Sequence, residues 1–466
     1  MREVGIGVAG LGTVGGGVLS ILERHQPEIE ARLGARIVVR KVVLRNPEKS
    51  RAVEVEKGIV TTRMQDLLDD PDVAVVVELI GGTGEAFDLV KGALERGKHV
   101  VTANKALLAA RGEELFRLAA EKGVDVYYEG AVCGGVPIIR TLREALASDR
   151  ITSLHGIVNG TTNYILSAMA EEGKPLSKAL AEAQRLGFAE ADPTLDVSGG
   201  DAAQKLCVLA QLAFGARLRQ EDVLTEGIIG LEPEDFIWGR EFGYALKLLA
   251  VARRCQLEAA PERVADDSSS AGGLAEEKPG LPSGSGWPYP PDTIEARVHP
   301  TFIPAGSLLA GVRGAFNAVL LRSEALGPSL LFGQGAGAMP TGSAVVSDII
   351  DLSRNILSRS PGRVPLPPAQ ARVGLRPHAE IRCGYYLRFT VKDVPGVLAR
   401  IATTLAARSI SIAAVQQREQ SEEGGAVPLV IVSHRAREAD VQAAIAEVDR
   451  YDTTVARTRL IRIESP

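Results

Sequence analysis

The stretch VGIGVAGLGTVG, residues 4–15, decides how the fold is interpreted. Its apolar first half, up to Ala9, is typical of a strand, and a helical pattern over Val14–Arg24 follows at once. Glycines in the spacing GxGxxG allow a tight turn and bring a helix N-terminus close to a pyrophosphate. In this strand–helix context the motif predicts a dinucleotide site at Gly10, Gly12 and Gly15.

The chain continues after this stretch as an alternation of strand and helix patterns. Strands are expected over Ile37–Leu44, Val73–Ile80, His99–Thr102 and Val124–Tyr128, and helices over Glu85–Arg96 and Ala106–Lys122. Such alternation predicts a parallel sheet with helices on both faces. The sequence therefore predicts an α/β fold that begins with a Rossmann-type NAD(P)-binding domain over residues 1–135.

Length and composition exclude several classes of protein. A chain of 466 residues is expected to form two to four domains. A net charge of −5 lacks the basic footprint of a nucleic-acid-binding protein. The sequence contains no apolar run of about 20 residues, which is the length that a membrane-spanning helix needs. The four cysteines form no CxxC pair, and the first residues do not resemble a signal peptide, so we expect a cytoplasmic protein.

The middle of the chain is expected to form an α+β domain for substrate binding, catalysis and dimerisation, over residues 136–315. It is mostly helical up to residue 258, with β-like pieces at Thr152–Val158 and near Phe236. Residues 260–292 are rich in Ser, Gly and Pro and are interpreted as a mobile insertion, before a strand at Thr293–His299. Residues 316–357 are expected to form a helix that returns to the nucleotide domain, and residues 358–380 a linker.

The last part of the chain, residues 381–466, is expected to form a separate small unit. Its pattern is strand Tyr385–Val391, helix Gly396–Arg408, strand Ile410–Gln416, strand Val427–Ser433, helix Glu438–Val448 and strand Thr453–Ile463. The order βαββαβ predicts a ferredoxin-like module.

The stretch AQRLGFAEADPTLDVSGGDAAQK, residues 183–205, has the composition of a catalytic site. Asp201 and Lys205 are four residues apart and share one face of the expected helix. A partly buried lysine beside carboxylates can donate a proton or orient a substrate. An exposed ion pair is the alternative, and the spacing alone favours it.

A cluster of basic residues bears on the choice between NADP and NAD as cofactor. The second expected strand ends in Leu44-Arg45-Asn46, followed by Lys49 and Arg51, where an NAD-selective site usually has Asp or Glu. Arg45 and its neighbours suit a 2′-phosphate and favour NADP over NAD, although a solvated surface loop also fits this pattern.

Residues 183–205 closely resemble the signature of the homoserine dehydrogenases. The resemblance extends over about residues 2–355 and includes residues 10–15, 102–105 (TANK), 129–137 (EGAVCGGVP), 159–163 (NGTTN) and 333–337 (GQGAG). Residues 384–463, with DVPG at 393–396 opening a helix, resemble the ACT domain that many members carry. Two departures are GTGE at residues 82–85, beside the cofactor, and the long 260–292 stretch.

The resemblance implies a role for individual residues. The catalytic residues would be Lys205, Lys105 and Asp201, with Lys205 as the general acid/base and Lys105 in contact with cofactor and substrate. Glu190, Asp196 and Asp201 would hold the substrate amino group and set the environment of the lysine. The cofactor would be lined by Gly10, Gly12, Thr13, Val14, Gly15, Arg45, Lys105, Gly187 and Gly335. Glu129 and the backbone carbonyls of Val132, Gly134 and Val136 would enclose a sodium ion, which oxygen ligands suit.

The implied activity is the NAD(P)-dependent interconversion of L-aspartate 4-semialdehyde and L-homoserine, in threonine, methionine and isoleucine biosynthesis. The resemblance further implies a homo-oligomer, dimer or tetramer, and threonine as an allosteric effector of the ACT domain. Two alternatives stay open: a non-catalytic amino-acid sensor, and an acylating enzyme that uses Cys133 as nucleophile. The six histidines form no spaced pair and are expected to be structural.

Overall fold

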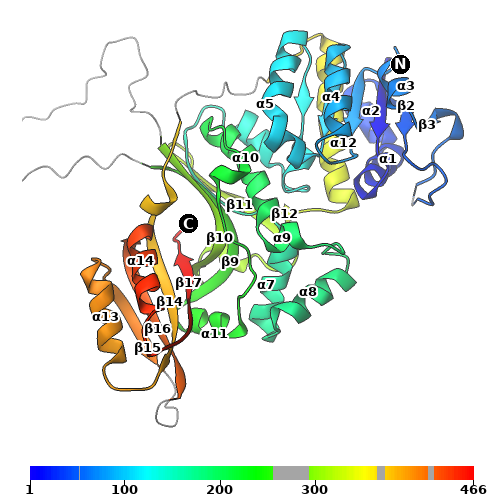
Figure 1. Ribbon diagram of the computed structural model, residues 1–466. Helices are drawn as coiled ribbons and strands as arrows, with labels where there is room; N and C mark the ends of the chain where they lie inside the picture. The colour runs from blue at the N-terminus through cyan, green and yellow to red at the C-terminus, as the bar shows by residue number, and fades with distance from the viewer. Residues whose placement is uncertain (52, 256–292, 365–372, 418–424) are drawn as a thin grey trace, which may run out of the picture.

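The computed structural model describes residues 1–51, 53–255, 293–364, 373–417 and 425–466. The expected mobile insertion and part of the expected linker lie outside these residues. A nucleotide-binding region, a middle region with a large curved sheet and a C-terminal module follow one another along the molecule (Figure 1). Within the described residues, no helix combines the length and apolarity needed to cross a membrane.

The N-terminal region is built on a six-stranded sheet in which every neighbouring pair is parallel. Its strands are β1 (Glu3–Ala9), β2 (Arg36–Val43), β3 (Val60–Thr61), β4 (Val75–Glu78), β5 (His99–Thr102) and β6 (Val126–Tyr127). The order is β3-β2-β1-β4-β5-β6. The chain reverses its direction of growth between β1 and β4, and ligands bind in the crevice at such a switch point. The predicted Rossmann-type sheet is confirmed.

Helices cover both faces of this sheet (Figure 1). They are α1 (Thr13–Arg24), α2 (Gln26–Leu33), α3 (Met64–Leu68), α4 (Glu85–Glu95), α5 (Lys105–Lys122) and, from late in the chain, α12 (Ala338–Ser358). A side chain at Gly17 of α1 would come within 1.9 Å of the Ala338 carbonyl oxygen, so α1 and α12 pack backbone to backbone.

The expected helix over residues 316–357 is wrong in its first half. Residues 316–334 form two antiparallel strands, β11 (Phe316–Ser323) and β12 (Gly327–Gln334), and only α12 returns to the nucleotide-binding region. In β11 an apolar run is buried on both faces, which periodicity cannot distinguish from a buried helix.

The middle region packs helices on the antiparallel strands β7 (Ile151–Ile157), β9 (Tyr244–Cys255), β10 (Thr293–Pro304), β11 and β12. The helices are α6 (Ile138–Arg140), α7 (Gly160–Glu172), α8 (Leu176–Arg185), α9 (Thr194–Val197), α10 (Gly200–Phe214) and α11 (Pro233–Glu241). Two short strands, β8 (Leu224–Thr225) and β13 (Gly374–Leu375), join β10 from the side, and β13 comes from the expected linker.

Two expectations for this region are wrong. Phe236 lies in helix α11, whose start is marked by Pro233 and by reciprocal Glu232 and Asp235 caps, and not in a β piece. The sequence predicts helix where the twelve-residue strand β9 lies, because Leu and Ala dominate it. Pairing with β10 along its whole length overrides that propensity.

The C-terminal module has the predicted βαββαβ order. Its elements are β14 (Arg382–Lys392), α13 (Val397–Ala407), β15 (Ile412–Gln417), β16 (Ala426–Arg437), α14 (Glu438–Val448) and β17 (Thr454–Ile463). It is not a separate unit, however. Thr301 and Phe302 of β10 pair in parallel with Arg462 and Ile463 of β17, so the two sheets form one continuous sheet of 11 strands.

Candidate active site

The glycine loop between β1 and α1 has the geometry of a dinucleotide site. A Cβ atom on Gly10, whose φ is 98°, would lie 2.6 Å from the Leu79 carbonyl oxygen, and one on Gly15 would lie 2.3 Å from the Gly10 carbonyl oxygen. By contrast, Gly12, the N-cap of α1, has open space around it. Thr13 and Val14 begin α1, where backbone N–H groups lack intrahelical partners. Two glycines therefore allow close packing, and the third leaves room for a ligand.

A hydrogen-bond relay positions Lys105 at the carboxyl end of β5. The Thr102 hydroxyl donates to the buried Glu78 carboxylate (2.6 Å) and accepts from the Asn104 backbone N–H (3.0 Å). The Asn104 side chain then caps α5 by accepting from the Leu107 N–H (3.1 Å). Lys105, the first residue of α5, is thereby fixed beside the crevice of the parallel sheet.

Asp201 holds the two candidate catalytic lysines on one buried carboxylate. Lys205 Nζ lies 2.7 Å from Asp201 Oδ2, and Lys105 Nζ lies 3.1 Å from Asp201 Oδ1. Lys205 Nζ also donates to the Val158 carbonyl oxygen at 2.8 Å. The Lys205 side chain is 12% exposed, so the alternative of an exposed i,i+4 pair is wrong. The structure brings together Lys105, Lys205 and Asp201, the three residues predicted to be catalytic.

The charges of this cluster reinforce one another. Burial lowers the pKa of the Lys205 ammonium, but Asp201, with smaller contributions from Cys133 and Asp196, raises that pKa above its usual range. Burial likewise works against the charge of Asp201, but Lys205 and Lys105 hold the pKa of Asp201 below its usual range. At neutral pH, Lys205 is therefore protonated, and its bonds to Asp201 and Val158 fix the orientation of its ammonium group. A proton donor to a developing alkoxide needs both properties.

Asn159 joins the second predicted carboxylate to the cluster. Its side-chain amide donates to Asp196 Oδ1 and to Asp201 Oδ2, both at 2.7 Å, and its oxygen caps α7 by accepting from the Thr162 N–H at 2.8 Å. Burial raises the pKa of Asp196. Asn before a helix predicts a cap, so the NGTTN motif carries a local signal for Asn159. The bridge between two carboxylates could not be predicted, because it joins residues 37 and 42 positions apart.

Three other predicted residues lie in loops, and one of them, Gly335, packs against Asn317, which donates to the same Val158 carbonyl oxygen as Lys205. Glu190 is exposed, in the segment between α8 and α9, where its backbone carbonyl accepts from Gln184. Gly187, with a φ of 79°, forms the exposed turn after α8. Gly335 packs against the side chain of Asn317: a Cβ atom on Gly335 would lie 2.2 Å from Asn317 Cγ, so this position cannot carry a side chain.

Arg45 is largely exposed, and it forms an ion pair that the sequence did not predict. Its Nη2 lies 2.9 Å from Glu85 Oε2, at the N-terminus of α4. Glu85 belongs to the GTGE departure from the family pattern. The cation expected to bind a 2′-phosphate thus has a carboxylate beside it.

The predicted sodium loop is buried and sharply turned. Cys133 and Gly134 have positive φ values of 56° and 29°, and both oxygens of the Glu129 carboxylate accept backbone N–H groups, from Ile139 (2.9 Å) and Arg140 (2.8 Å). The Val136 carbonyl accepts from the Ile138 N–H at 2.7 Å. Burial raises the pKa of Glu129. The described residues contain no group of three or more His, Cys, Asp or Glu side chains suited to a metal ion.

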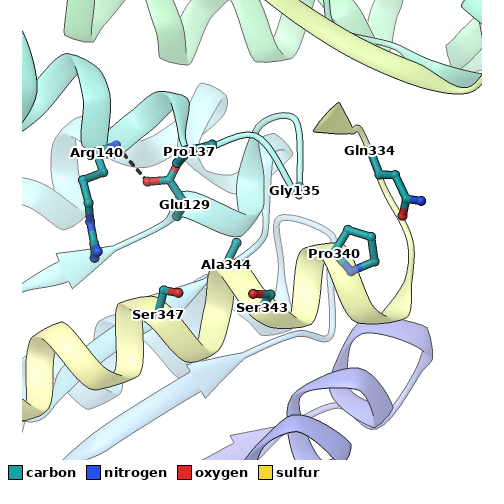
Figure 2. Close-up of a pocket in the computed structure, with 10 residues that line it drawn as sticks. Glu129, Gly135, Pro137, Arg140, Gln334, Pro340, Ser343, Ala344 and Ser347 are labelled. Carbon is teal, nitrogen blue, oxygen red and sulfur yellow. Dashed lines mark hydrogen bonds between the residues drawn. The ribbon is translucent and has the colours of Figure 1, made fainter. Parts of the chain in front are cut away.

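A cavity of about 460 Å³ lies between this loop and α12 (Figure 2). Its lining residues are Glu129, Gly134, Gly135, Pro137, Arg140, Gln334, Pro340, Ser343, Ala344 and Ser347. The lysine–carboxylate cluster does not line this cavity, so this hollow is not the place where the chemistry is expected.

Cys133 is unsuited to act as a nucleophile. Its side chain is buried, and burial raises the pKa of its thiol to about 11. A thiolate is the reactive form, so this environment disfavours the acylating alternative.

A glycine loop at the switch point of a parallel sheet, together with two lysines on one buried carboxylate, defines the class of NAD(P)-binding oxidoreductases. Family models for homoserine dehydrogenase and for its NAD binding domain match residues 137–350 and 10–129, and an ACT domain model matches residues 385–451. The chain belongs to the homoserine dehydrogenase family, and its ACT domain and its oxidoreductase activity are those predicted from the sequence.

Individual relatives match most or all of the chain. A homoserine dehydrogenase of Pseudomonas aeruginosa is 42% identical, with 100% of this chain and 99% of the relative covered. The crystal structure of a homoserine dehydrogenase from Thiobacillus denitrificans is 43% identical, with a TM-score of 0.86 and coverage of 100% and 99%. A hyperthermophilic archaeal homoserine dehydrogenase in complex with NADPH is 26% identical, with a TM-score of 0.58, and covers 76% of this chain and 98% of its own.

Proposed function

We propose that this enzyme reduces L-aspartate 4-semialdehyde to L-homoserine with Lys205 as the proton donor. The observation that carries the proposal is the buried carboxylate of Asp201, which holds both lysines within 3.1 Å. When bound, the reduced nicotinamide supplies hydride to the aldehyde carbon. Lys205 stabilises the charge that develops on the aldehyde oxygen and transfers its proton there, while Asp201 keeps the ammonium aimed.

The substrate α-ammonium is assigned to the acidic residues Glu190, Asp196 and Asp201. Asp196 and Asp201 are already held together by Asn159. Glu190 is exposed in the segment between α8 and α9, and its part in the assignment rests on the resemblance to the family.

A direct assay tests the reaction against both alternatives. Purified enzyme should oxidise NADPH when aspartate semialdehyde is added, without phosphate, and should form homoserine. An acylating enzyme would not oxidise NADPH in this mixture; it would instead oxidise aspartate semialdehyde to an acyl phosphate, consuming phosphate and reducing NADP+ to NADPH. Absence of turnover, with threonine still binding, would indicate the amino-acid sensor.

NADP(H) is proposed as the preferred cofactor, with NAD(H) also accepted. The basic residues at the end of β2 support this preference, as does the NADPH bound to the archaeal relative. A guanidinium can bind a phosphate through two parallel hydrogen bonds. Arg45 has to exchange Glu85 for that phosphate, and an exposed ion pair costs little to break.

The cofactor assignment predicts the effect of Arg45→Asp. This change removes the phosphate-binding cation and places a second carboxylate beside Glu85, so the ratio of kcat/KM for NADPH to that for NADH should fall about tenfold or more. Glu85→Gln is the matched control and should move the same ratio in the opposite direction. An unchanged ratio in Arg45→Asp would contradict the assignment.

Sodium binding is proposed for Glu129 and the carbonyls of Val132, Gly134 and Val136. Oxygen-only ligands suit a hard cation. Burial raises the pKa of Glu129 and raises that of neighbouring Asp348 well above its usual range, so a bound cation would stabilise the ionised form of these carboxyls.

Three further proposals come from the sequence. The protein forms a homo-oligomer, either a dimer or a tetramer, and it is located in the cytoplasm. Threonine is the effector of its ACT domain. Gly396, with a φ of 92°, caps the N-terminus of α13, where backbone N–H groups can donate hydrogen bonds to a ligand carboxylate. Asp393, three residues earlier in the sequence, offers a carboxylate to the ligand ammonium.

The effector assignment predicts the behaviour of Asp393→Ala. Threonine should inhibit the wild-type enzyme, and the variant should need at least about tenfold more threonine for the same inhibition, because the ammonium loses its charged partner. The rate without threonine should stay unchanged. Inhibition curves at fixed substrate measure both, and equal curves for the two proteins would place threonine elsewhere.

A further inference from the structure

Arg462 of β17 links the C-terminal module to Glu226 of the middle region. The Arg462 side chain is 1% exposed, and that of Glu226 is 41% exposed. On one side it donates to both carboxylate oxygens of Glu438 in its own module, at 2.9 and 2.7 Å. On the other side it donates to both oxygens of Glu226, each at 2.8 Å, in the segment after β8. Paired, charge-assisted bonds of this kind fix the position of both partners.

The segment that carries Glu226 lies directly against the turn between α9 and α10. The Ile228 N–H donates to the Val197 carbonyl at 2.9 Å. A side chain on Gly227 would come within 2.0 Å of that same oxygen, and one on Gly199 would lie 3.2 Å from the Glu226 carbonyl oxygen. The two backbones are therefore in close contact, and a shift in one has to move the other.

That turn carries the two carboxylates of the active site. Asp196 directly precedes Val197, and Asp201 lies two residues after Gly199, in the first turn of α10. Asn159 holds these carboxylates from one side, and the segment 226–228 supports their backbone from the other.

We propose that Glu226 is a positioning residue through which the docked C-terminal module sets the placement of Asp196 and Asp201. The inference rests on the proposed function, since it assigns these carboxylates to the substrate. The module thus contributes to substrate affinity through Arg462, at a distance from any effector site. A change in how β17 sits on β10 is transmitted to the substrate carboxylates by this link.

A second attachment of the same module provides a matched control. Arg388 of β14 pairs with Glu232 (2.6 Å), Glu234 (3.3 Å) and Asp235 (3.0 Å) at the start of α11. This attachment also joins module and middle region through a buried guanidinium. The two attachments differ in the element that they contact in the middle region. Arg388 contacts the start of α11, whereas Arg462 contacts the segment that packs against the turn of Asp196 and Asp201.

Kinetics of Glu226→Ala and Glu232→Ala in the full-length enzyme test the proposal. Glu226→Ala should raise the KM for homoserine about tenfold, because misplacing a binding group by a fraction of an ångström is costly. The KM for the dinucleotide should change less than about twofold, since the glycine loop lies in another region. Glu232→Ala should leave both constants near wild type. Glu226→Gln, which keeps one acceptor for Arg462, should be intermediate.

Three outcomes would overturn the proposal: equal rises in KM in both alanine variants, no rise in Glu226→Ala, or equal rises in the KM values for homoserine and dinucleotide. If Glu226→Ala does not fold, the Gln variant carries the same comparison. If the wild-type enzyme does not turn over homoserine, the proposed function fails on its own. Amide hydrogen exchange over residues 194–201 then decides, with faster exchange expected in Glu226→Ala than in Glu232→Ala.

Discussion

Lys205→Met should lower kcat by about two to four orders of magnitude and leave NADPH affinity nearly unchanged. Methionine keeps much of the length and apolar volume of lysine but removes both the proton and the charge. General acid catalysis contributes about 10²–10⁴-fold, and lost stabilisation of the alkoxide adds to it. Steady-state kinetics and fluorescence titration with NADPH measure the two effects.

Neighbouring variants separate the role of Lys205 from that of its partners. Asp201→Asn should cost less in kcat, because it alters the environment of the lysine and one substrate contact. Lys105→Met should weaken both kcat and cofactor binding, since Lys105 sits at the end of β5 beside the crevice. A fall of less than tenfold for Lys205→Met would contradict its role, and Lys105 or an ordered water would then become the candidate donor.

The direction of the Lys205 pKa gives this assignment a pH dependence. Asp201 raises that pKa above its usual value, so the ammonium persists at neutral pH and aldehyde reduction has its donor. Homoserine oxidation needs the neutral amine as base. Its kcat should therefore rise with pH through the alkaline range, and Lys205→Met should flatten that rise.

Local signals are enough to predict much of this molecule. The GxGxxG turn, the strand–helix alternation and the βαββαβ order depend on residues close in sequence, and the six-stranded order and the C-terminal module agree with them. The pairing of Lys205 with Asp201 can be predicted for the same reason, since both residues lie within one turn of α10.

Long-range contacts account for what the sequence does not predict. The strand β9 is a strand because β10 pairs with it, and the strands β11 and β12 likewise stabilise each other. Asn159 bridges carboxylates far along the chain, and Lys105 reaches Asp201 from the other domain. No periodicity encodes these contacts. The docking of the C-terminal module on β10 is also a long-range contact, and it changes the expected effect of removing that module.

If the C-terminal module were the separate unit expected from the sequence, truncation after residue 357 would keep catalysis. The structure leads us to expect loss of soluble, stable protein. Removing the module strips β17 from β10 and exposes apolar side chains of the middle region, because Phe302 packs edge-on against Tyr386 with ring centroids 5.1 Å apart.

The truncation also breaks a buried ion pair. Arg297 is 0% exposed and binds both Glu464 and Glu295, and only Glu295 remains after the cut. Leaving a buried charge without any partner costs about 3–5 kcal/mol; because Glu295 still pairs with Arg297, we expect a smaller loss, which is still a sizeable part of the roughly 5–15 kcal/mol that stabilises a typical protein. We expect aggregation on expression, or a thermal unfolding midpoint at least about 10 °C lower.

Two full-length point variants separate the ion pair from the rest of the module. Glu464→Gln removes the charge that faces Arg297 and should lower the unfolding midpoint clearly. Arg400→Ala breaks the exposed pair of Arg400 with Asp452, inside the module, and should change stability by less than about 1 kcal/mol. A truncated enzyme that is soluble and melts like the full-length protein would contradict this prediction, and it would restore the C-terminal module as an independent unit joined only through its linker.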